Sequence, residues 1–235
     1  MASKTHAVMQ SLRSNPRLAR FRGDPRVHAV VGAVNTPLAK ARARRTFAAA
    51  PRPIKLEIGG TSNRPGWVIT NVNPIADNWL DATVTWPFED GAIEYLYADN
   101  MIEHVSLEAG RAMFAEAYRC MKPGGVIRLA TPDIRKHVEL YLAGDAAVKS
   151  DLADIYRSIG FPVEYPSDLL RITIGQFGHN EGYIYDFESI RAELERAGFT
   201  NVVECAVGSS EHIALDGLDS RVEEASGQMT VEATR

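Results

Sequence analysis

The sequence predicts an α/β domain built on a largely parallel sheet. From residue 54 onward, short apolar runs typical of β-strands alternate with segments of helical period. Gly-Gly, Asn-Pro and Pro-Gly-Gly turn signals separate the two kinds of segment. Hydrophobic residues make up 45% and charged residues 24% of the chain, which excludes collagen-like and wholly disordered proteins. The apolar stretches are far shorter than the roughly 20 residues of a membrane span, so we expect none.

Six segments have the pattern of strands: 54–58, 67–72, 93–97, 126–130, 201–207 and 229–233. A helix is predicted over 106–122, with Ser106 as its N-cap and Pro123-Gly124-Gly125 as its stop signal. A second helix begins at Asp186 and ends at Gly198, a residue type common in the left-handed position after a helix. The long polar segment between the last two strands leaves room for an antiparallel return.

The first 52 residues are predicted to form a basic helical arm ahead of a domain over 53–235. Residues 1–55 contain 12 lysines and arginines against the single acid Asp24, although the whole chain has a net charge of −4. Leucines and arginines between residues 12 and 21 have the spacing of a short amphipathic helix, and a second basic cluster spans 40–45. The arm could pack on the acidic body or on a second subunit, bind an anionic partner, or serve in targeting.

The two cysteines, Cys120 and Cys205, are too few for a disulfide framework, and no C-x-x-C or His-rich segment accompanies them. We expect both to be buried, reduced thiols. The start of the chain lacks a basic segment followed by an apolar one, so a secretory signal is not recognised and a cytoplasmic location is expected.

Polar and small residues gather where the predicted strands end, which is where ligands bind in an open parallel sheet. These segments are KLEIGG (55–60), NVNP (71–74), LDAT (80–83), YADNMIEHV (97–105) and MKPGGVIRLATPDI (121–134). The G-x-G-x-x-G fingerprint and the Walker A pattern are both absent from the sequence, which disfavours a nicotinamide cofactor and phosphoryl transfer.

The order and spacing of these segments resemble the class I S-adenosylmethionine-dependent methyltransferases. Within that class, the chain is similar to small predicted methyltransferases associated with glycan and cell-envelope assembly. The most specific matches are WPFEDGAIEYLYADNMIEHV (86–105) and MKPGG (121–125), and the resemblance covers roughly 54–233. It implies a Rossmann-like sheet of seven strands whose last strand is antiparallel, with S-adenosylmethionine as cofactor.

The resemblance also implies a set of cofactor-binding residues: Glu57, Gly59, Gly60, Asn73, Asp81, Ala82, Asp99 and Asn100. The first three match the glycine-rich motif under the methionine and ribose. Asn73 stands where the family usually has an acid that binds the ribose hydroxyls, and Asp81 with Ala82 matches the position beside the adenine. Asp99 and Asn100 would face the methionine and the methyl group.

The chain departs from the family at two of these positions. Gly59-Gly60-Thr61 replaces the usual G-x-G, and Asn73 replaces the ribose-binding acid. An amide has fewer acceptor sites than a carboxylate, so we expect cofactor affinity about tenfold weaker than with the acid.

Histidines are the candidate general bases, because methyl transfer to a hydroxyl needs an aligned acceptor and a group that removes its proton. His104 and His179 lie in segments where chemistry could occur, and each could be a general base or a structural residue. His137 and His212 are expected in polar surroundings. Asp99, Glu103 and His104 could hold magnesium or manganese. An ordinary acidic rim explains them as well, so no metal is predicted.

The segment 133–186 is rich in aromatic residues and is predicted to be an insertion. It could cover a flat or sugar-like acceptor, or its aromatic residues could form its own core. We therefore predict O-methylation of a saccharide or another small hydroxylated metabolite, with the acceptor class implied by the family alone. A homodimer is possible.

Two alternatives remain open. One is a nucleic-acid methyltransferase that uses the basic arm, although the acidic body and the missing Asn/Asp-Pro-Pro-aromatic motif make nucleic acid unlikely. The other is a subunit of this fold that has lost catalysis.

Overall fold

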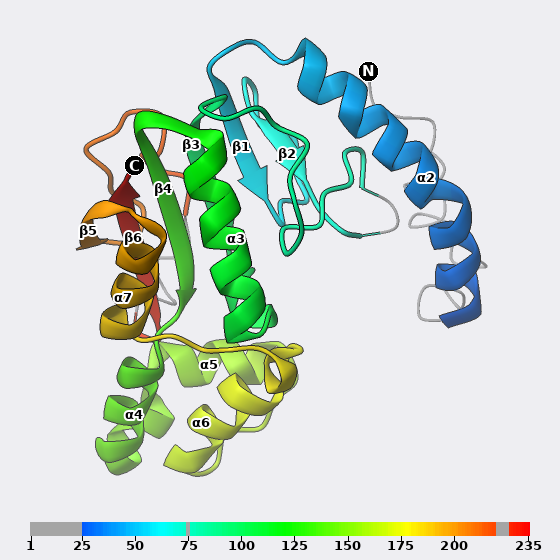
Figure 1. Cartoon of the computed structure of the whole chain (residues 1–235). Coiled ribbons are helices and arrows are strands. Elements are labelled where there is room, and N and C mark those ends of the chain that lie inside the picture. Colours follow the sequence, from blue (N-terminus) through cyan, green and yellow to red (C-terminus); the bar gives the residue numbers. More distant parts are fainter. Residues whose placement is uncertain (1–24, 74–75, 220–225) are drawn as a thin grey trace.

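The computed structural model describes residues 25–73, 76–219 and 226–235. Its sheet has the strand order β2-β1-β3-β4-β6-β5 (Figure 1). Strands β1 to β4 are parallel to one another, and β6 runs antiparallel to both of its neighbours. The strands are β1 Ile54–Ile58, β2 Val68–Thr70, β3 Ile93–Asp99, β4 Met121–Pro132, β5 Thr200–Cys205 and β6 Gln228–Thr234.

All six predicted strands are confirmed, and the last strand is antiparallel as expected. The prediction of seven strands is wrong for the described residues, which form six. Residues 76–92 are the ones that could have added a strand beside β2, but only one bridge forms there, between Asn71 and Trp79. Soon after it, the Asp81 carboxylate accepts hydrogen bonds from the Thr83 N–H (2.9 Å) and hydroxyl (2.7 Å). A local turn of this kind competes with a strand ladder.

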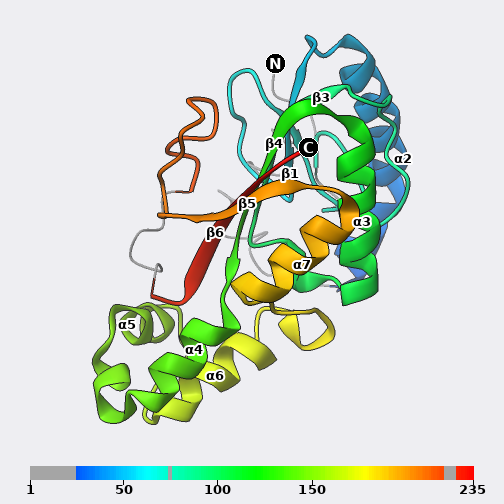
Figure 2. The same cartoon turned by 60° about the vertical axis from the view of Figure 1, so that its left-hand side comes forward.

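Helices α3 and α7 lie side by side on one face of the sheet in both views (Figures 1 and 2). Ser106 caps α3 by accepting from the Ala109 N–H, and α7 begins at its cap Asp186 and ends at Gly198, which has φ +107°. These ends agree with the sequence prediction, except that α3 stops at Cys120, before the Pro-Gly-Gly signal. The helices are α2 Pro25–Ala49, α3 Leu107–Cys120, α4 Ile134–Leu142, α5 Asp151–Ser158, α6 Pro166–Gly175 and α7 Phe187–Ala197, with 3-10 turns η2 Ile102–His104, η3 Gly144–Lys149 and η4 His179–Glu181.

The C-terminal part of α2 packs on the body of the protein. Ala43 and Phe47 are buried in the main core, and the Phe47 ring lies 4.5 Å from the Phe88 ring. The Lys40 ammonium lies 3.9 Å from the centre of the Trp79 ring, a cation–π contact. The helix predicted between residues 12 and 21 lies outside the described residues, and the domain boundary at residue 52 stays a prediction. No helix in the described ranges is both long and apolar enough to cross a bilayer.

Both cysteines are free thiols. Cys120 is buried in the main core, and this burial raises its pKa to about 12. Cys205 is only partly buried because it ends β5, the outermost strand of the sheet, so the expectation of two buried thiols is correct only for Cys120.

A buried ion cluster fastens the segment 206–219 to the sheet. The Arg128 side chain on β4 is fully buried and donates to both Asp219 oxygens, at 2.7 and 3.0 Å. It also donates to Glu232 of β6 (2.5 Å) and to the Ser209 carbonyl (3.0 Å). Asp219 in turn accepts from the backbone N–H of Gly208. The guanidinium therefore joins β4, β6 and the loop between β5 and β6.

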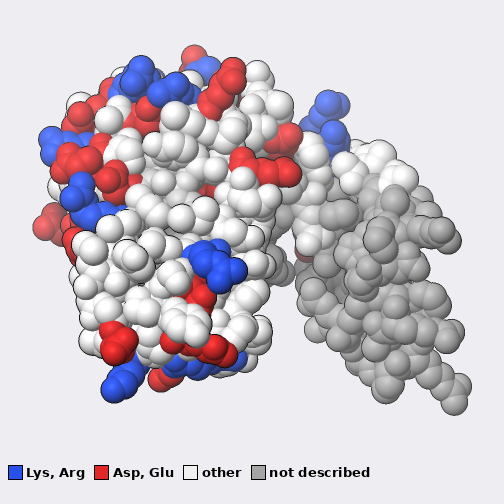
Figure 3. Space-filling view, turned by 90° about the horizontal axis from the view of Figure 1, so that it is seen from below, with Lys and Arg blue, Asp and Glu red and all other residues white. Residues whose placement is uncertain are grey.

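The insertion between β4 and α7 forms a separate bundle beyond the end of β4 (Figure 1). It has its own buried cluster, made of Ala147, Leu152, Ala153, Tyr156, Val163, Leu169 and Ile172. Tyr156 and Phe161 therefore belong to that core, whereas Tyr141, Tyr165 and Phe177 are exposed. Seen from below, much of the middle of the body is free of charged side chains (Figure 3).

His137 is also part of the insertion, and the polar groups around it belong to the protein interior. The side chain is buried, with Nδ1 2.9 Å from the Asp133 carbonyl and Nε2 3.4 Å from the Tyr156 hydroxyl. Burial lowers the pKa of His137.

Candidate active site

The carboxyl ends of β1 to β4 lie together at one edge of the sheet. Ile58 pairs with Thr70 on one side and with Ala98 on the other, and Asp99 pairs with Ala130. Because these strands are parallel, the loops that follow them meet at this edge, which the insertion also adjoins (Figure 1).

The glycine turn after β1 is held by the end of β2. The Gly59 N–H donates to the Thr70 carbonyl (2.9 Å), and Gly59 adopts φ +82°, a conformation that favours glycine. The Asn71 amide donates to the carbonyls of Gly59 (2.7 Å) and Gly60 (3.2 Å), and its oxygen accepts from the Asn73 N–H (2.8 Å). Asn71 therefore sets the shape of the turn. Sequence reasoning missed this residue because the family pattern pointed only to Asn73.

Glu57 lies beneath the same turn. The side chain is buried, and its Oε2 atom accepts from Arg64 Nε at 3.0 Å. Burial raises the pKa of Glu57, while the Arg64 guanidinium opposes the rise. A Cβ atom on Gly60 would lie 2.5 Å from Glu57 Oε1 and 2.7 Å from Ile69 Cγ2, so a side chain at this position requires Glu57 or Ile69 to move.

We expect Gly60→Ala to weaken the binding of S-adenosylmethionine by at least tenfold and to lower the free energy of unfolding by about 1 to 3 kcal/mol, as overpacking does. The methyl group would push Glu57 and the turn apart. Gly175→Ala is the matched control, because a Cβ there meets no heavy atom within 4 Å. Titration calorimetry and urea unfolding of both variants test this. Wild-type affinity in Gly60→Ala would contradict a role for the turn in binding.

The other predicted cofactor residues lie around the same edge. Asn73 is exposed and comes three residues after the end of β2, and Asp81 accepts the two hydrogen bonds from Thr83 described above. Ala82 is buried, and its carbonyl accepts from Trp86 Nε1 at 3.0 Å. Asp99 ends β3, and its role, like those of Asn73, Asp81 and Ala82, stays a prediction.

Asn100 has φ +45°, and its N–H donates to the Ala130 carbonyl at 2.9 Å. Its side-chain oxygen is buried and has no hydrogen-bond partner within the described part of the chain. An unused acceptor at this edge fits a ligand that brings donors, as the ammonium and hydroxyl groups of S-adenosylmethionine would.

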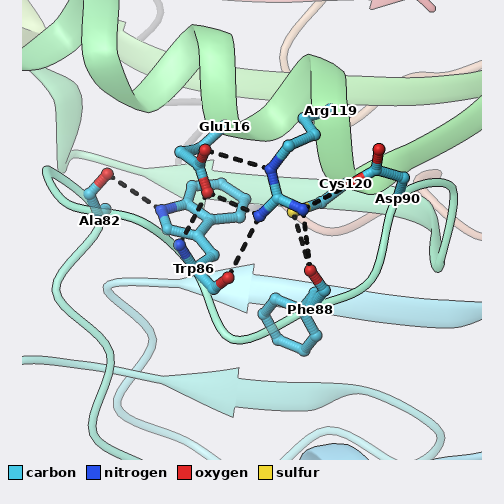
Figure 4. Close-up of polar contacts among 7 residues, drawn as sticks. All are labelled: Ala82, Trp86, Phe88, Asp90, Glu116, Arg119 and Cys120. Atoms are coloured by element: carbon cyan, nitrogen blue, oxygen red, sulfur yellow. Dashed lines mark hydrogen bonds and ion pairs between the residues drawn. The ribbon is translucent and has the colours of Figure 1, made fainter.

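A clamp on α3 holds the segment that contains Asp81 and Ala82 (Figure 4). Arg119 donates to the carbonyls of Trp86 (3.1 Å) and Phe88 (3.0 Å), and it pairs with Glu116. Glu116 accepts from the Trp86 N–H at 2.7 Å, and the hydrogen bond from Arg119 lowers its pKa. This pair was not singled out from the sequence. Glu116 and Arg119 are three residues apart on a predicted helix, a spacing at which side chains meet, and this could have indicated the ion pair.

The structure brings His104 and His179 together, although 75 residues separate them in the sequence. Their ring centres are 4.8 Å apart. His179 Nδ1 lies 2.7 Å from the Thr173 carbonyl, so Nδ1 carries the proton and the Nε2 lone pair stays available. Burial lowers the pKa of both histidines, and the neighbouring His179 lowers that of His104 further. Both imidazoles are therefore neutral at neutral pH.

Glu103 completes this group. The side chain is fully buried, and its Oε2 atom accepts from the Thr131 hydroxyl at 3.0 Å. Its Oε1 atom lies 4.0 Å from His179 Nε2. The carboxylate and the two histidines offer ligand atoms within 4.8 Å of one another. The structure thus groups Glu103 and His104 with His179, in place of the Asp99 considered from the sequence.

A family profile described as "Methyltransferase domain" matches residues 68–129. This segment contains Asn73, Asp81, Ala82, Asp99, Asn100 and His104, but neither the glycine turn nor His179. The match supports the methyltransferase class that the sequence resemblance implied. No curated protein sequence matches the chain.

Several solved structures are similar to the chain at low identity. A SAM-dependent methyltransferase from Thermotoga maritima, described as a possible histamine N-methyltransferase, is 15% identical, with 92% of this chain and 96% of that chain covered and a TM-score of 0.44. A SAM-dependent methyltransferase from Archaeoglobus fulgidus is 15% identical, with 85% and 94% covered and a TM-score of 0.44.

Phosphoethanolamine N-methyltransferase 2 from Haemonchus contortus, in complex with phosphomonomethylethanolamine and S-adenosylhomocysteine, is 14% identical, with 85% of this chain covered and a TM-score of 0.43. The chain spans only 52% of that protein and 55% of the CurJ carbon methyltransferase. All these TM-scores are below 0.5, so these structures do not assign the chain to a class.

Proposed function

We propose that this protein is an S-adenosylmethionine-dependent methyltransferase that methylates an oxygen of a small hydroxylated acceptor, with a saccharide as the expected class. One observation carries the proposal. The segment that matches the methyltransferase-domain profile includes strands that end at this edge of the sheet, where the glycine turn lies and where two neutral imidazoles meet. A fold of this kind binds its ligands at that edge.

The residues at the edge fit the cofactor. Gly60 packs closely on the buried Glu57 carboxylate, as a glycine turn at this edge requires, and the buried Asn100 oxygen has no hydrogen-bond partner within the described residues. Glu57, Gly59, Gly60 and Asn100 would hold the methionine and ribose portions, with Asp99 beside them. When bound, S-adenosylmethionine supplies a methyl group on a positively charged sulfur, which leaves as a neutral thioether.

The histidines favour an oxygen acceptor. With the methyl donor bound at this edge, a ring nitrogen of His179 or His104 would accept the hydroxyl proton of the acceptor as its oxygen is methylated. The Thr173 carbonyl holds His179 in the tautomer that can accept this proton. The exposed Phe177 ring, 5.7 Å from the His179 ring, offers a surface on which a sugar could stack.

Thermal unfolding with S-adenosylmethionine and S-adenosylhomocysteine tests the cofactor. At 100 times the dissociation constant, a ligand stabilises by about 2.7 kcal/mol, so we expect the midpoint to rise by roughly 5 to 10 °C. Release of S-adenosylhomocysteine with a panel of sugars, other alcohols and amines then identifies the acceptor. No shift at millimolar ligand would contradict the proposal and favour a subunit without catalysis. Methylation of amines alone would contradict O-methylation.

The homodimer and the cytoplasmic location stay predictions. Light scattering on the purified protein measures the mass in solution, and cell fractionation measures the location. Two members of the 40–45 basic cluster contact the body, since Lys40 lies over Trp79 and Arg42 Nε donates to the Asp77 carbonyl. These contacts support an arm that packs on the body over one that holds nucleic acid.

A further inference from the structure

We propose that Glu103, His104 and His179 form a binding site for a divalent transition-metal ion of the zinc class. The site shares His104 and His179 with the proposed function, but its test is independent of that function, because metal binding requires neither S-adenosylmethionine nor an acceptor. In the part of the chain that the structure describes, this is the one group of three histidine, cysteine or acidic side chains whose ligand atoms converge closely enough for a metal ion.

The three ligands come from two segments. Glu103 and His104 lie on η2, directly after β3, and His179 begins η4 at the end of the insertion. The insertion chain returns against η2 so closely that a Cβ on Gly182 would lie 1.8 Å from the Glu103 carbonyl oxygen. The Tyr183 N–H donates to the Val105 carbonyl at 3.0 Å. These contacts hold the two segments in place.

Two of the ligands are oriented by hydrogen bonds from behind. The Thr131 hydroxyl donates to Glu103 Oε2, which leaves Oε1 on the side of His179. His179 Nδ1 donates to the Thr173 carbonyl, so Nε2 faces Glu103. Histidines that bind metals commonly donate their second nitrogen to a carbonyl or carboxylate in this way.

The donor set selects the type of metal. Two neutral imidazoles and one carboxylate suit zinc and similar transition metals, whereas magnesium prefers oxygen ligands. Ligand atoms around a four-coordinate zinc ion are about 3.3 Å apart, so the 4.0 Å between His179 Nε2 and Glu103 Oε1 must shorten slightly. His104 is the exposed member of the group, and binding an ion would require its ring to move relative to the Asn100 backbone, to which it is hydrogen-bonded.

Three protein ligands leave at least one coordination position open, as in catalytic zinc sites. A nitrogen lone pair that binds a metal ion cannot also accept a proton. Zinc bound at the two imidazoles would therefore prevent direct removal of an acceptor proton by either of them. Metal binding and the histidine base are then alternative states of one site.

The test is the thermal unfolding midpoint of chelator-treated protein with zinc or magnesium chloride. We expect zinc at 100 times its dissociation constant to raise the midpoint by about 5 to 10 °C and magnesium to leave it unchanged. Elemental analysis after gel filtration should find one zinc per chain. Cobalt should give the visible absorption of a low-coordinate site.

Two variants separate ligation from structure. His179→Asn keeps a donor for the Thr173 carbonyl but removes Nε2, and Glu103→Gln keeps an acceptor for Thr131 but removes the charge. Both should abolish the zinc shift while the metal-free protein unfolds near the wild-type midpoint. His212→Gln is the matched control and should retain the shift, because His212 lies outside the group.

A zinc shift that persists in both variants, or no zinc shift in the wild type, would overturn the proposal. If either variant fails to fold, the cobalt spectrum of His104→Gln decides, because that side chain is exposed. A wild-type spectrum would overturn the site, and loss of the visible bands would support it. A shift with S-adenosylmethionine but none with zinc would contradict only the metal site. A shift with zinc but none with S-adenosylmethionine would contradict only the proposed methyltransferase function.

Discussion

His179→Asn is expected to lower turnover by about 10² to 10⁴-fold, the usual contribution of a general base, while cofactor binding stays at the wild-type level. Asparagine can still donate to the Thr173 carbonyl, as His179 Nδ1 does at 2.7 Å, so the local structure should persist. It lacks the Nε2 lone pair that would take the acceptor proton. Turnover is measured as release of S-adenosylhomocysteine with the best acceptor from the screen, in the presence of a chelator.

His104→Asn is measured beside it, because either imidazole could be the base. The histidine that accepts the proton should show the large loss, and the other a smaller one. His212→Gln should leave turnover unchanged. Wild-type turnover in both active-site variants, or a loss of S-adenosylmethionine binding without an effect on turnover at saturation, would contradict the histidine base.

Arg128→Met is expected to lower the free energy of unfolding by about 3 to 5 kcal/mol, the range for breaking a buried ion pair by removing one partner. Arg128 is fully buried, and its loss leaves Asp219 and Glu232 in the interior without their cation. Urea unfolding measures the change. Arg191→Met is the control, because Arg191 pairs with Glu195 on the surface of α7, where such pairs contribute about 0 to 1 kcal/mol. A similar small loss in both variants would contradict the prediction.

The same cluster should make stability depend on pH. Burial alone would raise the pKa of Asp219, but hydrogen bonds from Arg128 and the Gly208 N–H outweigh it, and the net pKa is lowered. A carboxyl with a lowered pKa stabilises the folded state above its unfolded pKa of about 3.9 and loses this effect as the pH falls through the folded pKa. The wild type should therefore lose more stability than Arg128→Met below about pH 4.

The strands and helix ends could be predicted from the sequence because their signals are local. Ser106, Asp186 and Gly198 cap helices through contacts within a few residues, and IKLEI and VIRLA are apolar runs next to turn signals. The seventh strand was expected from the resemblance and not from a strand pattern. In its place, the chain near Asp81 forms a turn, and Arg119 on α3 binds the carbonyls beyond it.

The candidate site was only partly predictable. His104 could be placed after β3 because it lies only five residues beyond the end of that strand. Its contact with His179 depends on the path by which the insertion returns past Gly182, which no local pattern encodes. The burial of His137 could not be predicted for the same reason, since one of its neighbours, Tyr156, comes from another helix.

The separate core of the insertion has a consequence for how long the histidine pair stays assembled. Proteins open in cooperative units whose free energies of opening range from near zero up to that of global unfolding. Leu152 and Leu169 lie in a cluster distinct from the one that contains β1, β3 and β4, so we expect the insertion to open as a unit of its own. His179 would then leave Glu103 while the sheet stays folded. On this expectation, local opening of the insertion sets the lifetime of the pair, and the site can be lost without global unfolding.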